Sequence, residues 1–451
     1  MQPGFITCAL VVLVALPVMA TDASAQQPET SVRGESRRLT SAEKPPAQWS
    51  LSFQEVLERA RQQAPTARVA RARIAEAEAR LVGARARLRS NPEVSATLGP
   101  RTSEGDHSSD VEIGVSQVFE LGGRRAARVA GAQAGIDEGT AVAEEAIRFA
   151  LRDAALAFYD ALRARERVRL LGEAKHVADE VLRSAERRYQ AGDIAVLDVN
   201  VARAQLARAL TAEAAARADL TRPLADLRVL LGLSRGDGLH LRGSLTDAQP
   251  EGQAYELTRR IADPSSPVAQ RRTSELMDRV DDLPAFRALD AQIREARADQ
   301  ALARAQAKPD VGLSASYANE EASHILLGGL TITLPTFQKG QELSAAAAAR
   351  LTRLSLERDA LRREAEVRLQ AALERYREER RGLESLERDA LPGLEENETL
   401  AQRSYEAGEL SLPEWLVLRR ELLETRLEHV DRLFGVARSA LDVDFASGVL
   451  R

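Results

Sequence analysis

The chain has 451 residues, of which 29% are charged and only 4% are aromatic, and its formal net charge is -5. Ala, Arg, Glu and Leu dominate, a composition typical of long or coiled helices rather than of a compact mixed core. The Arg residues alternate with Glu and Asp and form no separate basic block, which argues against a nucleic-acid partner.

The first 25 residues have the pattern of a secretory signal peptide. The apolar run from Phe5 to Ala20 is too short for a comfortable membrane span, and Ala23-Ser24-Ala25 supplies a cleavage site of small residues, although no Lys or Arg precedes the run. The only Cys, Cys8, lies inside this run, so we expect a mature chain without thiols, disulfides or a lipid anchor. Residues 26–50 are polar and aperiodic and predict a flexible arm.

Residues 51–233 are predicted to form a first structural repeat. Its opening helical pattern ends at Asn91-Pro92, because Pro cannot continue a helix. Two alternating segments around a polar loop then predict a β-hairpin over 93–119. Each strand, at about ten residues, has the length that a tilted strand needs to cross a bilayer. A long helix over 124–189, a turn and another helix complete the repeat.

A second repeat over 283–446 follows a region, 234–282, that is richer in Gly, Pro and Ser and predicts a linker with one short helix near its end. The second repeat again has a helix that ends before a Pro, a hairpin over 310–334 and a long helix over 341–406. Pro392 predicts a kink near the end of that long helix. A last helix begins at Leu412.

The turns between the long helices have closely related sequences, AGDIAVLDVNVARAQL from Ala191 and AGELSLPEWLVLRREL from Ala407. In each copy a Tyr lies three residues before a Gly, an acid follows that Gly directly, and another acid lies six residues after it. These residues are Tyr189, Gly192, Asp193 and Asp198 in the first copy, and Tyr405, Gly408, Glu409 and Glu414 in the second. The duplication suggests that both turns contact a partner, and the simpler alternative is a pair of helix-capping glycines.

The lengths of the predicted helices favour a layer in which shorter helices stack end to end beside the long ones. In the last helix, apolar residues at three- and four-residue spacing predict coiled-coil packing; they are Leu416, Leu423, Leu427, Val430, Phe434, Ala437 and Leu441. Four strands per chain cannot close a membrane barrel, since the smallest such barrels have about eight strands. Several chains must therefore contribute strands, and the residues alone leave their number open.

From Leu51 to about Asp442 the sequence resembles the TolC-type outer-membrane efflux proteins. The most specific parts are the two turn segments, 189–205 and 405–422, and the strand-to-helix junction from Gln117 to Arg124. The resemblance implies a mainly α fold with a small β part. In it, a homotrimer forms a twelve-stranded transmembrane β-barrel from four strands per chain, above a long coiled-coil α-helical barrel that crosses the periplasm. Much of 234–282 would belong to an equatorial band around the helices.

The resemblance also implies a passive channel in the outer membrane, without enzymatic activity or a cofactor. Its partners would be a periplasmic adaptor protein and an inner-membrane pump of the RND type. The adaptor-docking residues carried over to this chain are Ala191, Gly192, Asp193, Ala407, Gly408 and Glu409. The periplasmic gate of the family falls on Glu414, whereas a second family gate acid is Val417 here. The alternative role for Glu414 is a favourable interaction with its own helix dipole.

The segments Glu120–Arg124 and Leu334–Phe337 resemble the branch that serves heavy-metal cation pumps more than the drug branch. No resident metal site is predicted, since the five His have no metal-ligand spacing, and His107 and His324 in the outer loops are only a minor candidate. The alternatives are a channel for multidrug efflux or type I protein secretion, and, in another class, a periplasmic coiled-coil scaffold without a barrel. No enzyme motif occurs in the sequence.

Overall fold

The computed structural model describes residues 48–103, 106–245, 274–320 and 323–450. The predicted signal peptide, most of the predicted arm and most of the linker lie outside these residues. The described helices are α1 (Phe53–Gln63), α2 (Pro65–Arg85), α3 (Arg124–Ala191), α4 (Val196–Leu230), α7 (Pro284–Gln306), α8 (Gln341–Asp389), α9 (Leu394–Glu406) and α10 (Leu412–Ala446), with a 3-10 turn η1 (Arg279–Asp282). The described strands are β1 (Gln48–Leu51), β2 (Glu93–Ser103), β3 (Asp106–Phe119), β4 (Gly238–Leu241), β5 (Asp310–Glu320) and β6 (Ser323–Thr333). The mainly helical fold with four long strands is confirmed.

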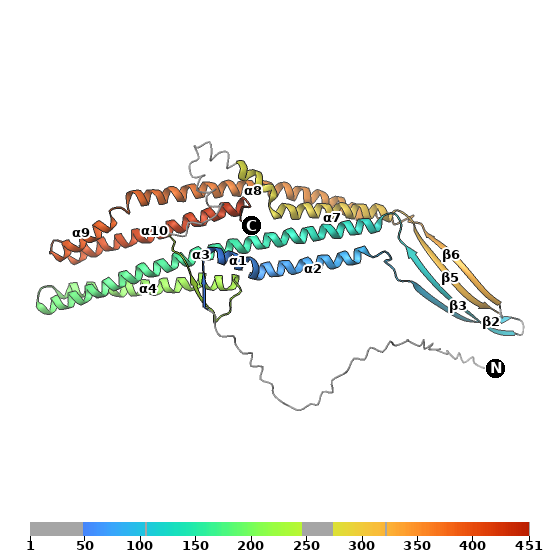
Figure 1. The fold of residues 1–451 in the computed structure, drawn as a ribbon, viewed down its shortest axis with the longest axis horizontal. Helices are drawn as coiled ribbons and strands as arrows, with labels where there is room; N and C mark the ends of the chain where they lie inside the picture. Colours follow the sequence, from blue (N-terminus) through green and yellow to red (C-terminus); the bar gives the residue numbers. More distant parts are fainter. Residues whose placement is uncertain (1–47, 104–105, 246–273, 321–322, 451) are drawn as a thin grey trace, which may run out of the picture. The chain divides into compact units, whose positions relative to one another are not determined.

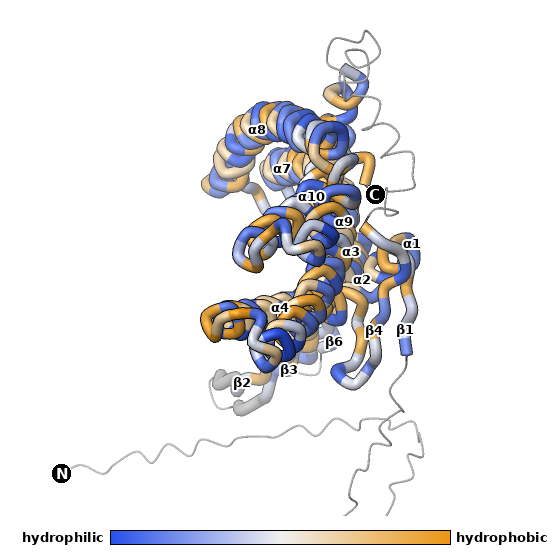
Figure 2. The backbone as a smooth tube through the Cα atoms, turned by 90° about the vertical axis from the view of Figure 1, so that its left-hand side faces the viewer, coloured by the Kyte–Doolittle hydropathy of each residue, from blue (hydrophilic) through white to orange (hydrophobic). Residues whose placement is uncertain are grey.

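The helix α3 runs for 68 residues without a break and is the axis on which the shorter helices pack. The helices α4 and α7 both pack on α3 and lie along different halves of it (Figure 1). The helix α10 lies against both α8 and α3. Figure 2 shows hydrophilic and hydrophobic residues mixed along the helices that face the viewer, as expected for helices that bury only part of their surface.

The long helix predicted over 341–406 is two helices, α8 and α9, separated by residues 390–393. Pro392 lies in this gap, and its ring and missing N–H prevent a continuous helix. The predicted kink is therefore a complete interruption. None of the helices in the described parts of the chain combines the length and apolar composition of a membrane-crossing helix.

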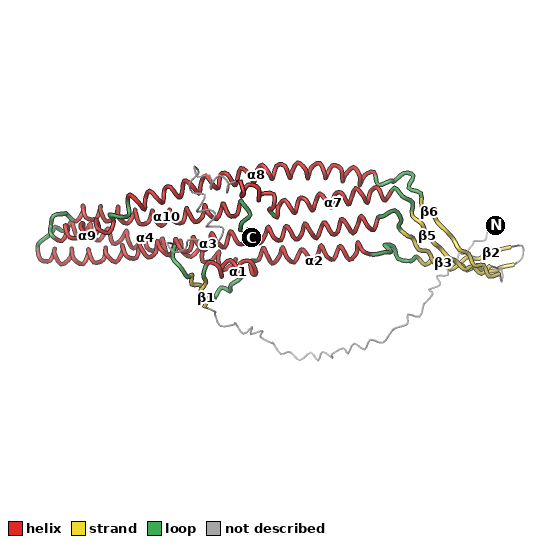
Figure 3. Tube along the Cα trace, turned by 45° about the horizontal axis from the view of Figure 1, so that its top comes forward, coloured by secondary structure: helices red, strands yellow, loops and turns green. Residues whose placement is uncertain are grey.

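The two hairpins join into one antiparallel sheet of four strands in the order β2-β3-β5-β6. The inner strands β3 and β5 pair from Val111 opposite Asn319 to Phe119 opposite Val311. This pairing leaves β2 and β6 as the two edges. The sheet lies at one end of the helices, and the α3–α4 and α9–α10 turns lie at the other end (Figure 3).

A short parallel pair, β1 with β4, was not predicted from the sequence. The flexible arm was expected to extend to residue 50, but residues 48–50 belong to β1. The side chain of Trp49 lies under the Arg59 guanidinium, whose central carbon is 4.0 Å from the ring centroid, and the adjoining Leu51 is buried. Strands of four residues are too short to show a clear alternation, so composition alone does not reveal them.

Two apolar cores hold the middle of the helices together. The first gathers Val56 of α1, Phe158 of α3, Leu227 of α4 and Val430 of α10. The second packs residues 274–286 against α8 and α10, with Phe286 and Tyr376 fully buried. The apolar seam of α10 contributes to the first core through Leu423, Leu427, Phe434 and Ala437, which confirms its predicted packing role.

Candidate functional site

The first turn, which we call the first tip (residues 191–193), closes α3 with a left-handed residue. Gly192 has φ = 86°, and its N–H donates to the Tyr189 carbonyl oxygen at 3.0 Å. The Asp193 N–H donates to the Arg188 carbonyl oxygen at 2.9 Å. These two bonds form a Schellman motif, which satisfies the last carbonyl groups of the helix. All three tip residues are exposed.

The second tip (residues 407–409) repeats this geometry after α9. Gly408 has φ = 79°, its N–H donates to the Tyr405 carbonyl oxygen at 3.1 Å, and the Glu409 N–H donates to the Ser404 carbonyl oxygen at 2.8 Å. A Cβ atom at either tip Gly would meet no atom within 4 Å. The positive φ therefore accounts for each Gly, and the space around each is open.

The tips differ in how the next helix begins. Ser411 caps α10: its backbone N–H and its hydroxyl donate to one carboxylate oxygen of Glu414 at 2.9 and 2.7 Å. These hydrogen bonds from Ser411 lower the pKa of Glu414 below its usual value. In the first copy Ala195 occupies the capping position and has no side chain that can bond. The family resemblance predicts a gate role for Glu414. In the structure, the Glu414 side chain forms a capping box with Ser411.

Replacing Ser411 with Ala should loosen only the start of α10. An N-cap substitution of this kind costs about 1 kcal/mol, so amide exchange at residues 412, 414 and 415 should accelerate about fivefold. Because the pKa of Glu414 is lowered in the folded chain, the capping contribution is present above about pH 4.5 and is lost as the pH falls through the lowered pKa. Hydrogen exchange measured between pH 7 and pH 3 checks both points. Ala195→Ser is the matched control and should slow exchange at the start of α4.

A buried aromatic side chain joins the helices of the two tips. Trp415 is only 2% exposed and lies in a cluster with Val181 of α3 and Val199 of α4. Its ring stacks on Tyr405, with the centroids 4.9 Å apart and an interplanar angle of 19°. The tips are therefore anchored to one common core rather than being independent hairpin ends.

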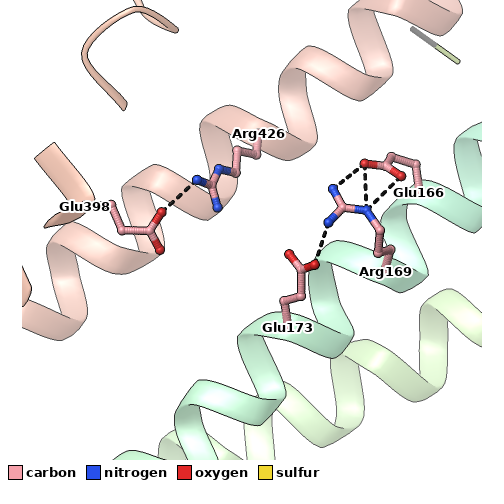
Figure 4. A network of polar contacts seen from close by, with 5 residues as sticks. All are labelled: Glu166, Arg169, Glu173, Glu398 and Arg426. Atoms are coloured by element: carbon pink, nitrogen blue, oxygen red, sulfur yellow. Dashed lines mark hydrogen bonds and ion pairs between the residues drawn. The ribbon is translucent and has the colours of Figure 1, made fainter. Parts of the chain in front are cut away.

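Beside this core, a groove of about 1050 Å³ runs between α3 on one side and α9 with α10 on the other. Glu398 of α9 bridges two guanidinium groups of α10, since its two oxygens lie 3.0 Å from Arg419 and 2.7 Å from Arg426. Burial lowers the pKa of Arg419, although the Glu398 charge opposes this shift. Figure 4 shows the contact between Glu398 and Arg426 beside a second network on α3, in which Arg169 is bound by Glu166 and Glu173.

At the other end of the chain, the register of the sheet separates two faces of opposite character, because directly paired residues project to the same side. One face, the apolar face, carries Val94, Ala96, Leu98, Val111, Ile113, Val115, Leu313, Tyr317, Leu326, Leu330 and Ile332. Several of these side chains are more than half exposed, among them Val94 at 72% and Leu330 at 63%. The polar face carries Ser95, Thr97, Glu112, Ser116, Ser314, Ser316, Thr331 and Thr333, with Val118, Ala318, Ile325 and Leu327 as apolar exceptions.

Comparison with known proteins agrees with this arrangement. A family model described as outer membrane efflux protein matches residues 56–233. The cobalt-zinc-cadmium resistance protein CzcC of Cupriavidus metallidurans is 26% identical over 362 residues, which cover 80% of this chain and 81% of that protein. The family match covers residues 56–233, and the relative is similar over most of the chain; both agree with the resemblance that the sequence indicates.

A second relative of this chain is the nickel-cobalt-cadmium resistance protein NccC of Alcaligenes xylosoxydans xylosoxydans. It is 28% identical over 341 residues, which cover 72% of this chain and 71% of the relative. Among solved structures, CusC superposes with a TM-score of 0.69 at 18% identity, covering 88% of this chain and 91% of CusC. The CmeC outer membrane channel of Campylobacter jejuni superposes with a TM-score of 0.68 at 16% identity, covering 88% of this chain and 85% of CmeC. These structures support the fold.

The six residues predicted to dock an adaptor thus lie at two exposed turns at one end of the helices, and Glu414 lies in the first turn of α10. The sequence did not predict a role for Trp415 or the groove beside it. The chain has only two Trp, and the position of one of them directly after Glu414 was a usable signal for a buried contact. Of the minor metal candidates, the side chain of His107 lies outside the described residues, and the Nδ1 atom of His324 lies 2.6 Å from the Tyr317 hydroxyl. Among the described residues, no group of three or more His, Cys, Asp or Glu is arranged to hold a metal ion.

Proposed function

We propose that this protein is the outer-membrane channel subunit of a tripartite export system for heavy-metal cations. Its trimer would be the passive conduit from the periplasm to the exterior. The observation that carries the proposal is the division of the chain between two ends. Paired, exposed, open turns lie at one end of the helices, and a four-stranded sheet with one apolar face lies at the other.

The sheet supports a barrel shared between chains. Its edges, β2 and β6, leave backbone N–H and C=O groups unpaired within one chain, and such groups are costly in lipid. Pairing β6 of one copy with β2 of the next satisfies them, and three copies of four strands give twelve. The apolar face would then contact lipid, and the polar face would line the lumen. Membrane fractionation tests this assembly. A trimer that fractionates with outer-membrane markers supports it, whereas a soluble monomer contradicts it.

The substrate class is supported by the relatives, which are named for resistance to cobalt, zinc, cadmium and nickel. A passive conduit takes its specificity from the pump, so the channel itself needs no resident metal site. A deletion strain tested against metal salts and drugs decides between substrate classes. Sensitivity to cobalt, zinc, cadmium or nickel that the intact gene reverses supports metal export. Sensitivity to drugs alone favours the multidrug alternative, and loss of a secreted protein favours type I secretion.

The tips are proposed to dock the periplasmic adaptor, and the RND-type pump is proposed to act through that adaptor. Reversing charge at both tips, with Asp193→Lys and Glu409→Lys together, should abolish most export, because a partner surface complementary to acids would now meet two cations per chain. Both side chains are exposed, so the trimer should form normally. Metal tolerance and trimer yield are the two measurements. If the double variant keeps the metal tolerance of the wild type, the turns do not dock the adaptor and are only the ends of helices.

Glu414 is proposed to contribute to a periplasmic gate, since three copies around a pore would place three carboxylates close together. Replacing Glu414 with Gln removes this charge but keeps the size and hydrogen-bonding ability of the side chain. Conductance and cation selectivity in a planar bilayer should both change. Ser411→Ala is the matched control, because it breaks the cap while leaving the charge in place. Identical currents for Glu414→Gln and wild type would exclude Glu414 from the gate.

A further inference from the structure

The groove between α3 and α9 contains charges that the chain itself does not use. Arg187 lies on the α3 wall and Arg403 on the α9 wall, and both are exposed. Neither has a carboxylate partner among the described residues. The other cations of the groove are engaged: Arg183 pairs with Asp179 at 2.5 Å, and Arg419 and Arg426 share Glu398.

The same groove also has an unused hydrogen-bond donor beneath it. Trp415 lines the groove, and its Nε1 atom is buried without a hydrogen-bond partner. A buried donor that lacks an acceptor is costly to the folded chain, and native structures contain few of them. The buried indole and the two unpaired cations line one hollow, and the two cations match an anionic acceptor.

We propose that this groove binds a carboxylate side chain on a helix of the partner protein. Arg187 and Arg403 would hold the carboxylate from opposite walls, and Trp415 would supply apolar contact below it. The inference rests on the proposed function, since it assigns a chemistry to the adaptor that the tips would dock. It adds a second contact surface, which lies beside the tips rather than on them.

The dimensions and composition of the groove favour a helix as the occupant. At about 1050 Å³ the groove exceeds what one carboxylate needs, and an α-helix with side chains is about 10 Å wide. Val177, Val181 and Tyr405 add apolar surface to its lining. An amphipathic helix with acids beside an apolar stripe would therefore match both parts of the groove.

A titration of the purified full-length trimer tests this. The probe is a stapled, Ala-based helical peptide with three Glu on one face, and the matched probe carries Gln at the same positions. Trp49→Phe leaves Trp415 as the sole tryptophan reporter. We expect a saturable change in Trp415 emission with the Glu peptide. Arg187→Gln with Arg403→Gln should weaken binding about tenfold or more, because charged hydrogen bonds are lost.

The control variant is Arg183→Gln, which removes a cation from the same groove that Asp179 already neutralises. It should change the affinity less than twofold. Equal affinity for the Glu and Gln peptides, no loss with the double Gln variant, or no saturable binding at millimolar peptide would each overturn the proposal.

An experiment in cells separates this inference from the proposed function. Arg187→Glu with Arg403→Glu should reduce metal tolerance while the trimer still fractionates with the outer membrane. Suppose that this variant keeps full metal tolerance while the tip variant, Asp193→Lys with Glu409→Lys, loses it. That result would contradict the proposed binding groove and leave the proposed channel function standing. Absence of a membrane-bound trimer in the wild type would instead contradict the proposed channel function.

Discussion

Replacing Trp415 with Ala is expected to destabilise the tip region by about 3–5 kcal/mol, the range for removing a fully buried large aromatic side chain. The ring is 2% exposed, stacks on Tyr405 and contacts a cluster drawn from α3, α4, α9 and α10. Both tips should therefore loosen together, although only one of them carries the substitution. Hydrogen exchange should accelerate in residues 181–202 as well as in residues 401–416, and the proposed export should fail.

The control for this prediction is Val417→Ala on the same helix. Val417 is 46% exposed, and substitutions at such positions usually change stability by no more than about 0.5 kcal/mol. Loosening confined to the second tip in Trp415→Ala would show that the two tips are not held by one core. Loosening of equal size in Val417→Ala would attribute the effect to the helix rather than to the buried ring.

A single charge on the sheet is expected to act oppositely on its two faces. Ala315 and Ser314 are neighbours near the centre of β5, and they project to the apolar and the polar face respectively. Ala315→Arg should cost about 2–4 kcal/mol, which is the cost of Arg at the lipid-facing midplane of a barrel. The yield of membrane-inserted trimer should therefore fall sharply.

Ser314→Arg provides the matched comparison, because it adds the same side chain in place of a similarly small residue. It should leave the insertion of the trimer nearly unchanged and should shift the ion selectivity of the pore toward anions. Heat-modifiable migration on gels measures insertion, and planar-bilayer recording measures selectivity. Equal loss of insertion in both variants would show that the apolar face does not contact lipid.

Much of the fold follows from local signals in the sequence. The predicted last helix begins at Leu412, as α10 does, and the hairpin predicted over 93–119 matches β2 and β3. Pro and Gly account for this success, since they end helices and form turns by constraints that depend on few neighbours. The two turns were predicted for the same reason, because the Gly, the acid and the Tyr recur at fixed spacing.

Features built from distant segments could not be read in this way. The pairing of β1 with β4 joins residues almost 200 positions apart, and neither strand is long enough to show a period. The groove depends on Arg187 and Arg403, which lie on helices from different repeats. Among many Arg in this chain, only the packed structure distinguishes those that have carboxylate partners from those that do not.

The interruption at residues 390–393 gives the two halves of the chain different mechanical properties. Bending α3 would stretch or break backbone hydrogen bonds that run without interruption for 68 residues. Between α8 and α9 the regular series of bonds is interrupted, since Pro392 has no N–H to donate and the Leu391 N–H donates to the Leu386 carbonyl oxygen, five residues back. We infer that α9 can change its angle at little enthalpic cost while α3 keeps its direction. A ring built from alternating α3 and α9 helices would widen when the α9 helices tilt, and no helix would need to unwind.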